Sequence, residues 1–304
     1  MRETPPQRRR TSRRESEERL KERLTGARWR RTVRETWESS APGWGKWEPT
    51  ILYNLSALDV PLLRALDLRP GHKLLDLACG TGEPALTFAQ WVLPRGHVTA
   101  VDHSAGMLRL ARARARSRGL RNVTFHRGDL ARLDALELGR FDRVVSRFGL
   151  FFAEDLDAVL DTIRGHLRPG GRAAFAVWGP LQDNQAWSLR AHAVAPFIEE
   201  EPQPENLPHP MRLARKGLLA RLLRAAGFRG VRTTAVAVPF VLPSAEDYWA
   251  MSSDTSATLA CLLRDLTKRQ RETVRRRLVR AARPYERDGV LRLPGLAWVV
   301  SGRR

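Results

Sequence analysis

The chain has 304 residues, 42% of them hydrophobic, which suits one large domain with a cap, and no apolar run reaches the ~18 residues of a membrane-spanning helix. Two cysteines, Cys79 and Cys261, exclude a disulfide framework, and neither they nor the seven histidines have the spacing of a metal site. The net charge of +20 favours either phosphate-bearing partners or an arginine-rich solvated surface, and because no apolar segment of a secretory signal follows the first arginines, we expect a cytoplasmic protein.

Two segments precede the first predicted strand. Residues 1–26 are basic and polar, which predicts a disordered arm. Residues 27–70 are rich in tryptophan, and they predict helices that break at Pro42-Gly43, followed by a helix over 56–68. The tryptophans fit two arrangements, a lid over a ligand or an anchor on the core, and the sequence leaves both open.

Residues 71–180 alternate between strand-like and helix-like segments. Such alternation predicts a parallel sheet with helices on both faces. The expected elements, in chain order, are strand 72–77, helix 83–93, strand 97–101, helix 104–118, strands 122–126 and 141–146, helix 154–167 and strand 171–178.

The pattern changes after residue 180. Residues 181–213 predict a cap insertion, and residues 214–304 predict the remainder of the fold, interrupted by a helical insertion at 244–286. The elements expected in this remainder are helix 214–226, strand 231–241 and a closing strand within 290–301.

The loop Ala78-Cys79-Gly80-Thr81-Gly82 directly follows the first buried strand and is the most informative stretch of the chain. Its glycines let the backbone pass close to a ligand. About twenty residues later a second apolar strand ends at Asp102, the spacing that places a carboxylate beside the ribose of a nucleoside cofactor. A nicotinamide dinucleotide is the rival ligand. Its fingerprint is Gly-x-Gly-x-x-Gly, and this chain has Ala85 in place of the third glycine.

Four segments in this order resemble the class I S-adenosylmethionine-dependent methyltransferases: 76–82, 101–108, 127–130 and 141–152. The chain is most similar to the branch with ubiquinone/menaquinone biosynthesis C-methyltransferases and related small-molecule enzymes. The resemblance covers 47–180 strongly and extends loosely through 231–301. It implies an α/β, Rossmann-like, seven-stranded, mostly parallel sheet with helices on both faces and a helical cap. It also implies S-adenosyl-L-methionine as cofactor and a small acceptor, such as a quinone precursor, a polyketide-like compound or another aromatic or apolar metabolite.

The resemblance implies a set of cofactor-binding residues at the strand ends, namely Asp76, Ala78, Cys79, Gly80, Thr81, Gly82, Asp102, His103, Met107, Asp129, Leu130 and Ser146. In this assignment Asp76 offsets the charge of the methionine amino group, Asp102 accepts hydrogen bonds from both ribose hydroxyls, and Asp129 accepts one from the adenine amino group. The chain departs from the family pattern at Ala78, where a third glycine is usual.

Arg147, after the fourth strand, is the candidate catalytic residue, because its charge would stabilise an enolate or phenolate; a surface salt bridge is the alternative role. The candidate substrate-pocket residues are Phe148, Trp178, Asn184 and Trp187. The chain lacks the motifs of enzymes that methylate exocyclic base amines, RNA cytosines or protein arginines. Two other functions remain open: an RNA methyltransferase that uses the basic arm and the arginine-rich run 268–283, and a non-catalytic cofactor-binding interaction protein.

Overall fold

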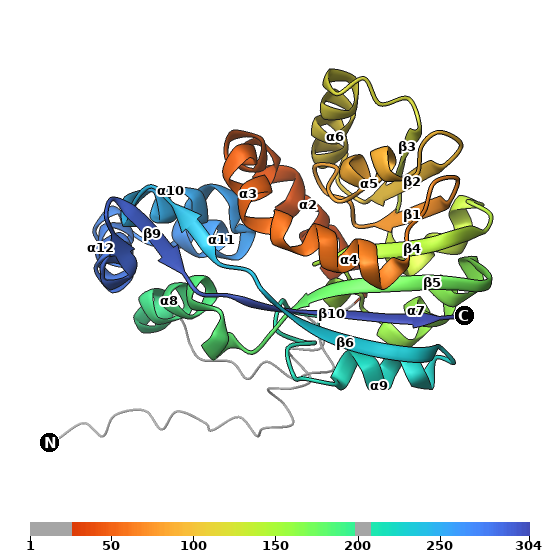
Figure 1. Cartoon of the computed structure of the whole chain (residues 1–304). Coiled ribbons are helices and arrows are strands. Elements are labelled where there is room, and N and C mark those ends of the chain that lie inside the picture. Colours follow the sequence, from red (N-terminus) through yellow and green to blue (C-terminus); the bar gives the residue numbers. More distant parts are fainter. Residues whose placement is uncertain (1–25, 198–207) are drawn as a thin grey trace, which may run out of the picture.

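The computed structural model describes residues 26–197 and 208–304, so the arm expected at residues 1–26 lies outside the described residues except for Gly26. A seven-stranded sheet of order β3-β2-β1-β4-β5-β10-β6 forms its centre (Figure 1). Strands β1 to β5 pair in parallel, whereas β10 is antiparallel to both neighbours, which confirms the predicted fold. The strands are β1 (Lys73–Leu77), β2 (His97–Asp102), β3 (Val123–Arg127), β4 (Phe141–Arg147), β5 (Leu167–Trp178), β6 (Arg229–Ala237) and β10 (Leu296–Arg303).

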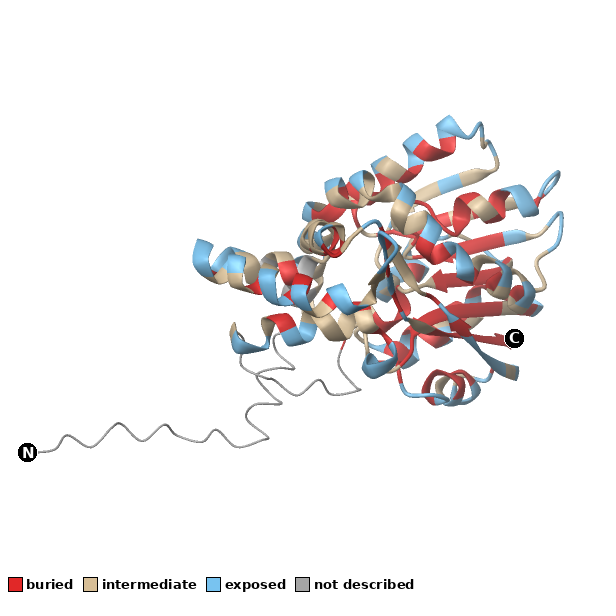
Figure 2. Ribbon diagram, turned by 60° about the vertical axis from the view of Figure 1, so that its left-hand side comes forward, coloured by how far each residue is buried: buried red, intermediate tan, exposed pale blue. Residues whose placement is uncertain are grey.

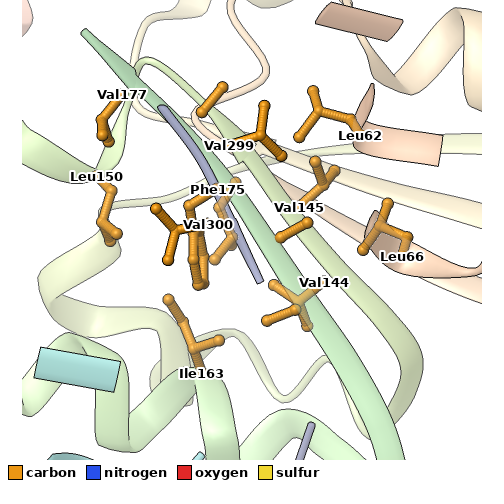
Figure 3. Packing of buried hydrophobic residues seen from close by; sticks show 14 of the residues in the cluster. Leu62, Leu66, Val144, Val145, Leu150, Ile163, Phe175, Val177, Val299 and Val300 are labelled. Atoms are coloured by element: carbon orange, nitrogen blue, oxygen red, sulfur yellow. The ribbon is translucent and has the colours of Figure 1, made fainter. Parts of the chain in front are cut away.

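Helices cover both faces of this sheet, because its central strands are apolar on both sides and must be shielded from water twice. Leu62 and Leu66 of α4 lie on one side of the strands, and Ile163 of α7 lies on the other (Figure 3). Buried residues follow the strands, while the outward faces of the helices are exposed (Figure 2). The covering helices are α4 (Asp59–Leu66), α5 (Ala85–Trp91), α6 (Ala105–Ser117), α7 (Leu156–His166) and α9 (Leu218–Ala225).

A second group of elements lies beyond one end of the main sheet and has its own apolar core (Figure 1). Figure 1 shows β9 leading directly into β10, so the chain passes from this group into the main sheet. The group consists of α8 (Gln185–Val194), α10 (Ala245–Thr255), α11 (Ala257–Asp265), α12 (Lys268–Ala282) and a three-stranded sheet of order β7-β9-β8, with β7 (Phe240–Leu242), β8 (Glu286–Arg287) and β9 (Val290–Leu293).

The strand predicted over 231–241 is divided between the two sheets as β6 and β7, so the prediction of one unbroken strand there is wrong. The closing strand predicted within 290–301 is confirmed by β10, which the separate short strand β9 precedes. Pro239 separates β6 from β7, and Pro294 separates β9 from β10. Proline has no N–H to donate to a strand ladder, which ends regular pairing at both places. The Val238 N–H still donates to the Gly295 carbonyl across the break, at 2.8 Å.

The N-terminal segment contains α2 (Gly26–Lys46) and α3 (Glu48–Leu55). The break predicted at Pro42-Gly43 is wrong, because α2 runs through Pro42. Gly43 lies against α10, where a Cβ atom on it would come within 2.1 Å of the Asp254 carbonyl oxygen. This close approach explains why a residue without a side chain stands inside the helix.

Candidate functional site

A cavity opens at the carboxyl ends of β1, β2 and β4, the edge where parallel α/β sheets bind ligands. Nine of the predicted cofactor residues line it: Ala78, Cys79, Gly80, Thr81, Asp102, His103, Met107, Asp129 and Leu130. The structure therefore brings together residues from three separate strand ends. Among the described residues, no group of three or more histidine, cysteine, aspartate or glutamate side chains could hold a metal ion.

The loop after β1 bends through backbone conformations that glycine favours. Gly80 and Gly82 have φ angles of 53° and 108°, and Ala78, at 57°, adopts the left-handed region despite its side chain. A Cβ built on Gly80 would meet no described atom within 4 Å, so this glycine borders open space in the cavity. Burial raises the pKa of the Cys79 thiol well above its usual value, which keeps the sulfur protonated.

Asp102 fixes the relative position of two loops. Its Oδ2 accepts a hydrogen bond from the Gly80 N–H at 2.8 Å, and its Oδ1 accepts one from the Ser104 N–H at 2.9 Å. Burial raises the pKa of Asp102, and these backbone donors oppose that effect. Because a carboxylate has about four lone-pair sites, Asp102 can accept further hydrogen bonds from the cavity.

Asp129 begins the turn after β3. Its side chain accepts a hydrogen bond from the Ala131 N–H at 3.0 Å, and Leu130 follows it along the cavity wall. Ser104 is likewise the N-cap residue of α6, and its hydroxyl accepts a hydrogen bond from the Met107 N–H at 3.1 Å. These caps turn the first residues of both segments toward the cavity.

Three predicted cofactor residues do not line the cavity. Asp76 is fully buried beneath the loop, where its Oδ2 accepts from the Ala85 N–H at 3.0 Å and its Oδ1 has no hydrogen-bond partner in the described part of the chain. Burial raises the pKa of Asp76 to about 8. Ser146 donates to the Leu77 carbonyl at 2.7 Å, and Gly82 packs against Leu86.

Arg147 lines the cavity from the end of β4, with its side chain 7% exposed. It pairs with Asp59 of α4 (Nη1 to Oδ1, 3.5 Å), and its Nη2 donates to the Glu83 carbonyl at 3.2 Å. Burial raises the pKa of Asp59 to about 6, while the Arg147 charge opposes this shift. Sequence reasoning missed Asp59, because no local motif connects α4 with the end of β4.

Only one of the four predicted substrate-pocket residues lines the cavity. Phe148 does so with a φ of 62°, and its ring stacks on Trp178 at 3.8 Å between centroids. Trp178 is buried behind it, and Trp187 lies one ring further back, 5.8 Å from Trp178. Asn184 holds the turn after β5, since it donates to the Gly179 carbonyl and accepts from the Leu296 N–H.

The rest of the wall comes from segments that sequence reasoning did not assign residue by residue. This part of the wall is mostly apolar. In the sequence, only the tryptophan-rich composition of residues 27–70 indicated that the segment could contact a ligand. The α2 and α3 residues are Arg30, Val33, Trp37, Trp44, Ile51, Leu52 and Leu55, and those near the 3-10 turn after β4 are Phe152, Ala153 and Glu154.

Helix α2 crosses the cavity and is fastened to the body along its length. At its start, Glu154 accepts from the Gly26 N–H at 2.6 Å and pairs with Arg30. In its middle, Glu38 accepts from the Gly106 N–H and the Ser104 hydroxyl, both at 2.8 Å. Its C-terminal end is held by contacts to α10, where the Trp44 indole donates to the Thr255 carbonyl at 3.2 Å.

Comparison with known proteins gives consistent matches. A family model described as a methyltransferase domain matches residues 74–171. Nocamycin O-methyltransferase of Saccharothrix syringae is 34% identical over 231 residues, which cover 68% of this chain and 81% of that protein. A ubiquinone/menaquinone biosynthesis C-methyltransferase of Cupriavidus necator is 33% identical over 178 residues, 54% of this chain and 70% of that protein.

Solved structures show the same fold at low identity. The YcgJ protein of Bacillus subtilis aligns with a TM-score of 0.53 and 16% identity, covering 82% of this chain and 98% of that one. A putative methyltransferase of Bacillus halodurans aligns with a TM-score of 0.50 and 17% identity, covering 80% of this chain and 97% of that one. In the described ranges, no helix is long and apolar enough to span a membrane.

Proposed function

Because the chain belongs to the S-adenosylmethionine-dependent methyltransferases, we propose that it methylates an oxygen atom of a small, flat and largely apolar acceptor. The observation that supports this proposal most is the composition of one cavity. Polar strand-end residues line one part of it, and aromatic and aliphatic side chains from α2 and α3 line another. The oxygen is proposed because one relative, which matches 68% of the chain, is an O-methyltransferase.

The residues of the cavity fit S-adenosylmethionine. The open space beside Gly80 and the unused lone pairs of Asp102 lie at neighbouring strand ends. We propose that Asp102 accepts hydrogen bonds from the ribose hydroxyls, that Asp129 and Leu130 bind the adenine, and that the loop from Ala78 to Gly82 holds the methionine part. Hydrogen bonds to a charged acceptor such as Asp102 contribute about 1.5–3 kcal/mol each.

In this proposal the buried Asp76 supports the cofactor loop from behind and does not touch the cofactor. It holds the Ala85 N–H and leaves one carboxylate oxygen unpartnered behind the cofactor loop. A cationic ammonium group bound in the loop would lower the pKa of Asp76 by attraction and favour its ionised form.

We propose that α2 and α3, within the segment 27–70, form a lid and that the acceptor lies beneath it, whereas α4 belongs to the core. Trp37 of the lid packs edge-on against Phe152 (5.8 Å between ring centroids) and close to Trp44 (5.7 Å). Flat rings of this kind suit a planar, conjugated acceptor. S-adenosylmethionine supplies an electrophilic methyl group when bound, so the protein's own task is to align the acceptor and exclude water.

Arg147 is the proposed catalytic residue. Arg147 lines the cavity, and its guanidinium stays protonated at neutral pH. Within residues 26–197 and 208–304, the guanidinium pairs with Asp59 and donates to the Glu83 carbonyl. The remaining N–H groups can donate to a negatively charged acceptor oxygen, which lowers the pKa of the acceptor hydroxyl and holds the oxyanion in place.

Calorimetric titration tests the cofactor site. We expect S-adenosylmethionine and S-adenosylhomocysteine, but not NAD, to bind wild type, and we expect Asp102→Ala to lose at least tenfold in affinity. Asp161→Ala, an exposed aspartate on α7, is the matched control and keeps wild-type binding. Tight NAD binding, or full affinity in Asp102→Ala, would contradict the assignment.

Transfer of a labelled methyl group tests the acceptor class. Hydroxylated aromatic and enolic compounds are offered beside total RNA at low and high salt. Label in the small compounds supports the proposal, whereas salt-sensitive label in RNA supports the alternative that uses the basic run 268–283. Cofactor binding without any transfer would favour the non-catalytic alternative.

A further inference from the structure

Arg114 of α6 is a buried arginine whose contacts reach three separate segments. It is 7% exposed, and it lies behind the cofactor loop rather than in the cavity wall. Its Nη1 donates to the Thr81 carbonyl at 2.5 Å and to the Thr81 hydroxyl at 3.1 Å. Its Nε lies 2.6 Å from Glu48 Oε1, in the first turn of α3.

The positive charge of Arg114 is compensated by two carboxylates only when the N-terminal helices are in place. Glu83 Oε1 lies 3.4 Å from Arg114 Nη2 and 2.7 Å from Arg118 Nη1, so two arginines share one carboxylate on the body of the protein. Glu48, which belongs to the lid, supplies the second carboxylate. Without Glu48, the carboxylate of Glu83, which Arg118 also contacts, is the remaining carboxylate partner of the buried guanidinium. A buried charge that is only partly compensated lowers the stability of the folded protein.

The same guanidinium holds the cofactor loop. Thr81 lines the cavity, and its carbonyl is directed away from the cavity toward Arg114. Arginine suits this role because its planar group donates in several fixed directions at once. A shift of Arg114 toward or away from Glu48 therefore changes the position of a loop that contacts the cofactor site.

We propose that Arg114 is a positioning residue that couples the docking of the α2–α3 lid to the shape of the cofactor loop. The coupling runs from Glu48 through the guanidinium to Thr81, and it works in both directions, so cofactor binding tightens the lid and lid docking strengthens cofactor binding. The proposal rests on the assignment of the loop to the cofactor.

Hydrogen exchange with S-adenosylhomocysteine as probe tests the coupling without any acceptor. In wild type we expect the ligand to slow exchange in residues 48–55 about fivefold or more, the lower end of typical coupling between sites. In Glu48→Gln we expect the ligand still to bind, with affinity reduced severalfold, and the ligand-dependent protection of 48–55 to disappear. Glu35→Gln, an exposed glutamate on α2, is the matched control and keeps the wild-type response.

A second variant separates positioning from general stability. Arg114→Lys keeps the positive charge but cannot contact Thr81, Glu83 and Glu48 together, so we expect it to weaken the coupling while Arg116→Lys, exposed on the same helix, does not. Helix α9 serves as an internal reference, because its exchange should not respond to these changes. If bound ligand protects 48–55 equally in wild type and Glu48→Gln, or in neither, the coupling is refuted; failure of the ligand to bind wild type refutes the cofactor assignment itself.

Discussion

The methyl group of Ala78 fills the space that a side chain at residue 149 would need. A Cβ atom built on Gly149 would lie only 2.3 Å from the Cβ of Ala78. Gly149 has a φ of −103°, which any residue can adopt, so contact rather than backbone conformation excludes a larger residue there. The alanine that replaces the family's usual glycine in the cofactor loop is thus matched by a glycine after β4.

The first prediction concerns this pair. Gly149→Ala should lower the free energy of unfolding by about 1–3 kcal/mol, because it overpacks a close contact. Ala78→Gly removes the opposing methyl group and relieves a positive φ, so Gly149→Ala should cost much less in that background. A double-mutant cycle measured by urea denaturation checks this, and equal costs in both backgrounds would contradict the relationship.

The second prediction concerns the pH dependence of stability. Burial raises the pKa of Asp76 from 3.8 to about 8, so between these pH values the folded protein holds a proton that the unfolded chain releases. The stabilisation is therefore complete at low pH and is lost as pH rises to about 8. Its size is on the order of 6 kcal/mol at most.

Asp76→Asn keeps an acceptor for the Ala85 N–H but does not titrate. We expect the loss of unfolding free energy between pH 5 and pH 8 to be smaller in this variant than in wild type by a few kcal/mol. Urea titrations at both pH values measure the difference, in which contributions from other groups, such as Asp59, cancel. Parallel pH profiles for the two proteins would show that Asp76 is ionised in the folded state.

The third prediction concerns catalysis. Arg147→Met removes the charge proposed to hold the acceptor oxyanion and should lower kcat by about a hundredfold or more. The dissociation constant of S-adenosylhomocysteine should change less than threefold, because Arg147 belongs to the acceptor side in this assignment. The kinetics are measured with the acceptor found in the labelling screen. A loss of cofactor affinity as large as the loss of kcat would place Arg147 in the cofactor site instead.

The fourth prediction concerns the contact between α2 and α6. Hydrogen bonding from the Gly106 N–H, opposed by burial, lowers the pKa of Glu38, so its contribution is present above the ordinary pKa of 4.5 and is lost in acid. Glu38→Gln removes the charge at the start of α6 and should speed hydrogen exchange in residues 30–46 at neutral pH. Unchanged exchange in this variant would mean that the Trp44 and Asp254 contacts suffice to hold α2.

The sequence predicted the fold wherever the signal was local. The strand ending at Leu77, the glycine loop and the strand ending at Asp102 each carry their own pattern, and parallel pairing brings their ends together. The sequence did not predict the residues whose role depends on a distant partner. Arg114 reads as one of several arginines on α6, and only the structure shows that it faces Thr81 and Glu48.

Two wrong expectations about proline have opposite causes. Pro42 predicted a helix break, but the neighbouring Gly43 packs so closely on α10 that tertiary contacts keep α2 continuous. The predicted strand 231–241 includes Pro239, but the missing N–H of this proline divides the strand between two sheets. Tertiary packing thus overrides the local preference of Pro42, whereas the local preference of Pro239 prevails.

The division of β6–β7 and β9–β10 between two sheets bears on how the proposed lid would open. Two chain crossings, joined by the Val238–Gly295 hydrogen bond, connect the C-terminal helices to the main sheet through the backbone. Helix α2 is held over the cavity by hydrogen bonds at its start, middle and end and by the close packing of Gly43 on α10. Opening of the proposed lid would therefore break these hydrogen bonds and the packing of Gly43, while every strand stays paired.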